Sequence, residues 1–279
     1  MADPRIYLVT GKGGVGKSTV AAALALRQAR SSGASVLVEV EDGRAAVRAL
    51  RGESSVRVMT VTHAAAMQNA ITRLLHTRIL AKAIVKQRSI ARLLDTVPAI
   101  RELVVLEEVR AIAQEFPNAS VVVDLPATGH AVDFLRVPAA AKRFLHSGPA
   151  AKMCDDILAQ VLNPSRSAIF VVSTFETVVA QETRELCERL KNELGFPATS
   201  IVMNRTPKAV DPNALAQLSE RAVHTPALRP IEEIARARAA ACQEAAKSRG
   251  ILAGFAPVLT VPEYFEDPSA AELVGELSW

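Results

Sequence analysis

The sequence predicts an α/β protein with a doubly wound, mostly parallel sheet flanked by helices. Short runs rich in valine, isoleucine and leucine alternate with longer helix-forming segments along the 279 residues. Such alternation is typical of a parallel sheet whose crossovers are helices. The first apolar run leads into a glycine-rich loop and then a helix, an arrangement that suits phosphate binding. Because no repeat, low-complexity segment or linker divides the chain, we expect one domain spanning residues 1–279.

Seven apolar runs have the length and composition of buried strands. They cover residues 6–10, 35–40, 56–61, 121–124, 168–174, 199–204 and 258–261. The first helix, rich in alanine and leucine, should begin just after Lys17. We also expect a long helical tract over about 63–115, a charged helix ending at Leu194 and a helix over about 231–249.

The glycine-rich loop has the spacing of a phosphate-binding loop. It comprises Gly11, Lys12, Gly13, Gly14, Val15, Gly16, Lys17, Ser18 and Thr19. The glycines let the backbone turn its N–H groups toward one anion, at the positive end of the following helix. In such loops the second lysine, here Lys17, reaches the β- and γ-phosphates, and the hydroxyl of Ser18 ligates Mg²⁺. The loop therefore predicts a bound nucleotide and Mg²⁺.

Lys12 occupies a position where most phosphate-binding loops have no lysine. It lies on the outer side of the expected phosphates, too far round to duplicate Lys17. With this residue the loop resembles the deviant Walker A motif of SIMIBI-like P-loop ATPases, which include MinD, ParA, nitrogenase iron protein and the ArsA/tail-anchored-protein-targeting branch. The resemblance implies ATP as the nucleotide, two subunits that sandwich it face to face, and a catalytic role for Lys12 on the partner's phosphates. The alternative is a solvated surface lysine.

Asp124 ends a run of three valines, at the carboxyl end of an expected central strand where α/β proteins place their ligands. It is the candidate Walker B aspartate, which holds Mg²⁺ directly or through water. The following Thr128-Gly129-His130 and the later Phe134-Leu135-Arg136-Val137-Pro138 resemble the ArsA branch, where this segment senses the γ-phosphate. MinD and ParA lack that Thr-Gly-His. A purely structural role for His130 stays open.

Asp42 is the candidate for positioning the attacking water. Members of the ArsA branch carry Asp-Pro-Ala-His after the strand that follows the first helix. Counting from the strand places Asp42 at the aspartate, but Gly43-Arg44-Ala45 follows it, so the proline and the histidine are absent. A carboxylate there can orient water or accept its proton. The alternative is that Asp42-Gly43 forms only a tight turn. Glu39 and Glu41 are nearby substitutes.

Asn204 is the candidate for reading the adenine base. The segment Val202-Met203-Asn204-Arg205 resembles the Val-Asn-Arg/Lys segment of the ArsA branch, whose asparagine contacts the adenine edge. A side-chain amide suits this role because it both donates and accepts hydrogen bonds. The alternative is a plain turn residue. Val261-Pro262-Glu263 falls where the family closes over the base.

Composition narrows the setting and the partners. No apolar run approaches the roughly 18 residues of a membrane span, and the polar start of the chain is unlike a signal peptide, so we expect a cytoplasmic protein. The three cysteines Cys154, Cys187 and Cys242 form no CxxC pair, which argues against a disulfide framework, a zinc site and arsenite chemistry. A net charge of +4 is too mild to predict nucleic-acid binding.

A basic, helical subregion lies within about 63–115. Between Glu53 and Asp95 the sequence holds no acidic residue, and Arg78, Lys82 and Lys86 recur every four residues beside apolar positions. This stripe is either the solvated face of an amphipathic helix or a surface for an acidic partner, a client or anionic lipid.

Together these features predict an ATPase of the ArsA/tail-anchored-targeting type that couples its nucleotide state to dimer closure and to an unidentified protein client. The chain has one phosphate loop, so it is expected to pair with itself or with a paralogous ATPase, and its activity to depend on that partner. Two alternatives remain: a non-hydrolysing ATP-binding subunit that regulates an active paralogue, and a MinD/ParA-like positioning ATPase.

Overall fold

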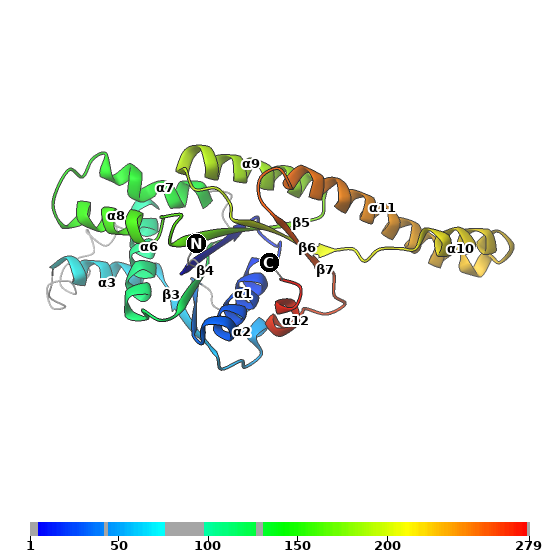
Figure 1. The fold of residues 1–279 in the computed structure, drawn as a ribbon, viewed down its shortest axis with the longest axis horizontal. Helices are drawn as coiled ribbons and strands as arrows, with labels where there is room; N and C mark the ends of the chain where they lie inside the picture. Colours follow the sequence, from blue (N-terminus) through cyan, green and yellow to red (C-terminus); the bar gives the residue numbers. More distant parts are fainter. Residues whose placement is uncertain (1–4, 42–43, 76–97, 127–130, 278–279) are drawn as a thin grey trace.

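The computed structural model describes residues 5–41, 44–75, 98–126 and 131–277. Its centre is a seven-stranded sheet in the order β3-β2-β4-β1-β5-β6-β7, with every neighbouring pair parallel (Figure 1). The strands are β1 (Ile6–Gly11), β2 (Ser35–Val40), β3 (Val56–Val61), β4 (Ser120–Asp124), β5 (Ser167–Thr174), β6 (Ser200–Thr206) and β7 (Val258–Pro262). The predicted α/β class is confirmed, and each predicted strand ends within two residues of the observed one.

Helices cover both faces of the sheet. One face packs against α1 (Lys17–Ser32), α2 (Arg44–Leu50) and α12 (Ala270–Val274). The other packs against α3 (His63–Leu75), α6 (Pro98–Glu115), α7 (Ala131–Lys142), α8 (Pro149–Gln160), α9 (Thr177–Leu194) and the C-terminal part of α11 (Arg229–Leu252). The inner strands β1 and β5 are buried along their whole length, because both of their faces are covered.

Helix α1 follows the phosphate loop directly. It begins at Lys17, as predicted, and ends before Gly33, whose φ of 85° gives the left-handed conformation common at helix C-termini. Every residue from Val20 to Leu26 is buried. The small alanines in this stretch let α1 lie close against the sheet and fix its N-terminus at the loop.

Within the described residues, the predicted helical tract over 63–115 contains α3 and α6, which pack against one another. Arg73 of α3 joins the two helices through ion pairs with Glu107 (3.1 Å) and Glu108 (2.6 Å) of α6. The basic stripe of Arg78, Lys82 and Lys86 lies outside the described residues.

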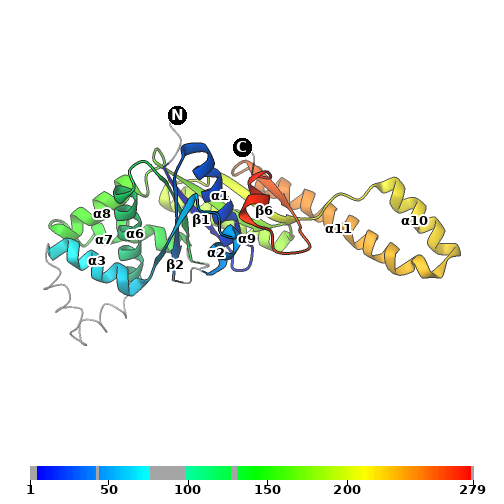
Figure 2. The ribbon, with the colours of Figure 1, turned by 90° about the horizontal axis from the view of Figure 1, so that it is seen from below.

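A helical hairpin projects from the body between β6 and β7 (Figures 1 and 2). It consists of α10 (Pro212–His224), the short 3₁₀ helix η1 (Pro226–Leu228) and the N-terminal part of α11. The sequence pattern predicted α11 but not α10, although Asp211-Pro212 is a helix-start signal: the Asp211 carboxylate accepts a hydrogen bond from the backbone N–H of Asn213 (2.9 Å). We call residues 207–240 the arm.

Within the described ranges, no helix combines the length and the apolar character that crossing a bilayer requires.

Candidate nucleotide-binding site

The phosphate loop lies at the carboxyl edge of the sheet, after β1. Strand β1 has β4 on one side and β5 on the other, so the chain changes direction across the sheet there, which is where open α/β sheets place their ligands. Gly11 has a φ of 144°, and a Cβ on it would lie 2.2 Å from the Val172 carbonyl oxygen of β5. Only glycine fits this close approach, so the loop's first residue is fixed by packing against β5.

Three predicted site residues meet below the loop. Lys17 is buried at the first position of α1, and Ser18 follows it. Asp124 ends β4, where its backbone is in register with Val9 of β1, and its carboxylate accepts a hydrogen bond from the Ser18 hydroxyl. The structure therefore brings Lys17, Ser18 and Asp124 together, as expected for a phosphate ligand and a metal site.

Burial sets the electrostatics of this cluster. It lowers the pKa of Lys17, an effect that the nearby negative charge of Asp124 opposes. Burial also raises the pKa of Asp124, which the Ser18 hydrogen bond and the positive charge of Lys17 oppose. Each of the two charges therefore offsets only part of the other's burial cost. A bound phosphate group beside Lys17 and a cation beside Asp124 would offset the rest.

The donor set fits Mg²⁺. Asp124 Oδ1 is buried and has no hydrogen-bond partner among the described residues. A buried carboxylate oxygen without a partner is costly unless a ligand satisfies it. Together with the Ser18 hydroxyl it offers the hard oxygen ligands that Mg²⁺ prefers.

Lys12 lies on the outer side of the loop and points to α9. Its Nζ lies 2.8 Å from Oε1 and 2.7 Å from Oε2 of Glu182. About half of each side chain is exposed, 49% for Lys12 and 47% for Glu182. Within one chain, therefore, Lys12 is turned away from the Lys17 cluster and pairs with a carboxylate.

Asn204 lies near the end of β6 and is hydrogen-bonded to the phosphate loop. Its Nδ2 donates to the Val15 carbonyl oxygen (2.8 Å), and its Oδ1 accepts from the Arg205 backbone N–H (2.9 Å). Gly16 packs so closely that a Cβ on it would lie 2.3 Å from Nδ2. The structure thus gives the predicted base-reading residue a second role, in positioning the phosphate loop.

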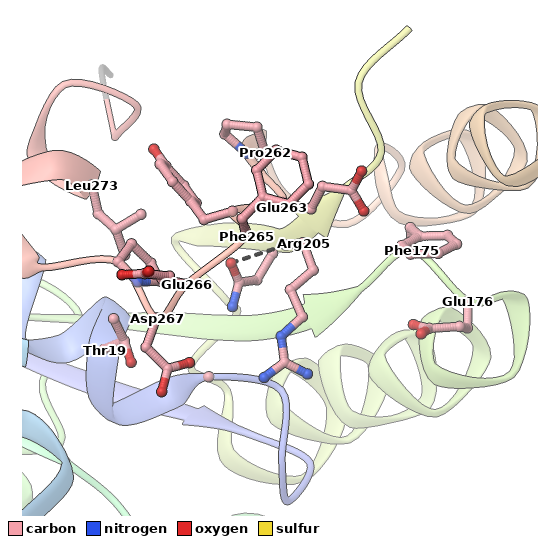
Figure 3. A pocket seen from close by; sticks show the side chains of 14 residues that line it. Thr19, Phe175, Glu176, Arg205, Pro262, Glu263, Phe265, Glu266, Asp267 and Leu273 are labelled. Carbon is pink, nitrogen blue, oxygen red and sulfur yellow. Dashed lines mark hydrogen bonds between the residues drawn. The ribbon is translucent and has the colours of Figure 1, made fainter. Parts of the chain in front are cut away.

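A cavity of about 410 Å³ opens beside Asn204. It runs from Thr19 and Asp267 at one end to Phe175 and Glu176 at the other (Figure 3). Its volume lies in the range of small-molecule sites. The loop over residues 262–268 forms one wall, and the sequence pattern had located only its first two residues, Pro262 and Glu263; the rest of this loop has no motif from which it could be found.

The segment after β2 carries the predicted water-positioning residue. Asp42 lies outside the described residues. The two substitutes are engaged at helix N-termini: Glu39 accepts from the Ala46 backbone N–H (3.1 Å), and Glu41 accepts from the His63 backbone N–H (2.8 Å) and pairs with the His63 imidazole. The hydrogen bond from the His63 N–H is the main cause that lowers the pKa of Glu41.

Two further predicted features have different outcomes. Thr128, Gly129 and His130 lie outside the described residues, and α7 begins immediately after them. The three cysteines lie on three different helices, α8, α9 and α11. Burial raises the pKa of the Cys187 thiol to about 12, which disfavours the thiolate that metals and arsenite require.

A wholly parallel sheet with a glycine-rich loop and the buried Lys17 near Asp124 at its switch strand defines a P-loop NTPase-like fold. The family described as anion-transporting ATPase matches residues 4–43, from before β1 to just after β2. ATPase BagA of Mycobacterium tuberculosis is 28% identical over 253 residues, covering 82% of this chain and 73% of its own. A Mycobacterium bovis relative aligns equally well. The predicted resemblance to the ArsA family of ATPases is confirmed.

Proposed function

We propose that the protein is an ATPase that binds Mg·ATP at the loop after β1 and closes as a two-subunit sandwich around it. The observation that carries the proposal is the cluster of the buried Lys17 with the half-buried Ser18 and Asp124, in which the buried Asp124 Oδ1 has no hydrogen-bond partner among the described residues. The resemblance to ArsA-family ATPases and to BagA supports the ATPase part of this proposal.

Each residue of the cluster has a distinct task in binding. The loop amides and the Lys17 ammonium bind the β- and γ-phosphates, at the N-terminus of α1. Ser18 and Asp124 would hold Mg²⁺, which supplies positive charge to the phosphate oxygens when bound. Asn204 fixes the loop through Val15 and places the adjacent cavity, where the adenine would lie, next to the phosphates.

Lys12 connects binding to closure. Its ammonium has a carboxylate partner, Glu182, in the single chain, and in the sandwich it exchanges that partner for the phosphates bound by the other subunit. The exchange is inexpensive, because an exposed ion pair contributes at most about 1 kcal/mol. A positive charge delivered in this way does the work of an arginine finger, which is worth about 10³ to 10⁵ in rate.

For hydrolysis, Asp42 is our candidate for orienting water, since Glu39 and Glu41 hold helix N-termini. The same engagement favours one alternative, a subunit that binds ATP without hydrolysing it and regulates a paralogue. In either case the partner in the sandwich is a second copy of the chain or a paralogous ATPase.

The test measures Mg·ATP turnover per subunit over a wide range of concentrations of the purified protein, together with equilibrium ATP binding. Turnover that rises with concentration would support a self-paired ATPase, and Asp42→Asn should then abolish it while leaving binding intact. Binding without turnover would support the regulatory alternative. Absence of ATP binding in the wild-type protein would refute the site assignment altogether.

A further inference from the structure

The apolar face of α11 continues beyond the body of the protein. Near its C-terminus this face comprises Ala245, Ser248 and Leu252, all buried. Ile234 lies eleven positions before Ala245, close to three turns of about 3.6 residues, so it falls on the same face, and Ile231 lies next to it one turn earlier. Yet Ile231 is 55% exposed and Ile234 is 68% exposed.

The exposed part of this face belongs to the arm. Arg238 attaches the arm to the body through its ion pair with Glu263, and inside the arm its Nε donates to the Lys208 carbonyl oxygen (3.2 Å). Farther out, the hydrogen bonds and ion pairs of the described residues stay inside the arm: Arg236 pairs with Glu232 (2.7 Å) and donates to the Ser219 hydroxyl (3.1 Å). The arm therefore lacks a cover for Ile231 and Ile234 within the described part of the chain.

Helix α10 does not provide that cover. It packs on a different side of α11, through Ala222, which is buried, and the half-buried Leu215 and Leu218. Val223, in the last turn of α10, is itself 71% exposed. We call Ile231 and Ile234 the arm patch.

The position of the arm restricts what can cover the patch. All strands are parallel, so β6 ends at the same edge of the sheet as β1, which is the edge that carries the phosphate loop. The arm leaves the body from the end of β6 and extends outward (Figures 1 and 2). From Arg229 to residue 240, α11 reaches about 18 Å at 1.5 Å per residue. A second subunit facing the phosphate loop would lie beside it.

Charges near the patch speak against an anionic membrane. Glu232 and Glu233 flank Ile231 and Ile234 directly in the sequence, and Arg236 is already paired with Glu232. Membrane-surface helices instead carry mainly Lys and Arg on the polar side of such a face. A rim of both signs around exposed aliphatic side chains is the composition of a protein–protein contact.

We infer that the arm patch packs against the second copy of this chain when the Mg·ATP sandwich closes. This inference rests on the proposed function, because it assigns a structural element to the dimer step. One face of α11 would then pack against two subunits. Ala245 and Leu252 contact the body of their own chain, and Ile231 and Ile234 contact the second copy.

The experiment compares sedimentation velocity of the wild-type chain with that of the double variant Ile231→Asp/Ile234→Asp, each with Mg·ATP and over a range of concentrations. Burying two charges in the contact should raise the dimer dissociation constant about 10- to 100-fold. ATP affinity of the separated subunit should be unchanged, because the patch lies outside the cavity and the loop. Phe144→Ser is the matched control, since Phe144 is 83% exposed on the connection between α7 and α8.

A photo-crosslinking residue placed at position 234 of the purified protein identifies the occupant. A nucleotide-dependent product of twice the chain mass is the expected result. If the wild-type protein and the double variant dimerise equally, the inference is overturned while the proposed dimeric ATPase stands. If the wild-type protein binds ATP but stays monomeric at all concentrations, the dimer step of the proposed function fails together with the inference.

Discussion

The phosphate loop and the arm differ in how far a single chain completes their packing. Around the loop, Asn204 bonds to Val15, Gly11 packs on β5, and α1 is buried from Val20 to Leu26. In the arm, Ile231 and Ile234 are exposed, and Arg238 pairs with Glu263 of the body. The loop is thus built to receive a small ligand in a rigid frame, whereas the arm presents a surface that another molecule can complete.

The largest effect should follow from removing Lys17. Lys17→Ala takes away the buried charge that binds phosphate and leaves Asp124 without its nearest cation. Losing one member of such a pair costs about 2 to 5 kcal/mol, so ATP affinity should fall roughly 30- to 5,000-fold in an equilibrium binding assay. The arm variant Ile234→Asp is the control and should bind ATP as the wild-type protein does. Equal affinity in Lys17→Ala and wild type would contradict the site.

The next effect concerns the frame of the loop. Asn204→Ala leaves the Val15 carbonyl oxygen without its donor, which should cost about 1 to 3 kcal/mol of stability and lower Tm in thermal unfolding. Asn204→Asp should behave similarly, because a carboxylate accepts from Arg205 but cannot donate to Val15. Asn213→Ala tests an exposed asparagine of the arm and should leave Tm nearly unchanged. A comparable loss in Asn213→Ala would remove the contrast between the two regions.

The sequence predicted the loop better than the arm because the loop follows from local chemistry. The glycine spacing, Lys17 and the valine run before Asp124 need no knowledge of the rest of the chain. The exposure of Ile231 and Ile234 cannot be deduced in this way, since their periodicity is the same as that of the buried residues farther along α11. The ion pair of Lys12 with Glu182 was also beyond prediction, because 170 positions separate the two residues.

A charge buried between α10 and α11 should destabilise the arm without affecting the phosphate loop. Ala222 is 1% exposed between α10 and α11, so Ala222→Asp should open the hairpin and speed amide hydrogen exchange in α10. ATP affinity should not change, because the contacts that the described residues make with the loop come from β5, Asn204, Asp124 and Glu182, outside the arm. Ala214→Asp, at an exposed position of α10, is the matched control. Weaker ATP binding in Ala222→Asp alone would show that the arm and the loop are coupled.

Asp124 should contribute a pH-dependent effect confined to the loop region. Its pKa in the folded state is raised above the ordinary value of 3.8, mainly by burial, so ionising it disfavours the fold. The associated stability is present below about pH 3.8 and is lost as pH rises through the raised pKa. Asp124→Asn should therefore have a higher Tm than the wild type at neutral pH without ligand, with the gap narrowing as pH falls. Mg·ATP should stabilise the wild type and not the variant. A lower Tm of the ligand-free variant at neutral pH would show that attraction to Lys17 outweighs burial.

The smallest effect should come from Glu182, whose exposed ion pair with Lys12 joins α9 to the phosphate loop. Glu182→Gln keeps the length of the side chain but removes the charge that holds Lys12 in its own subunit. Since an exposed pair is worth at most about 1 kcal/mol, ATP turnover at protein concentrations below dimer saturation should rise by up to about fivefold. High salt should remove the difference, because it screens the pair in the wild type. Glu185→Gln, a neighbouring carboxylate on α9, should change little. A fall in turnover in Glu182→Gln would mean that Glu182 supports Lys12 in the closed dimer instead of restraining it in the open subunit.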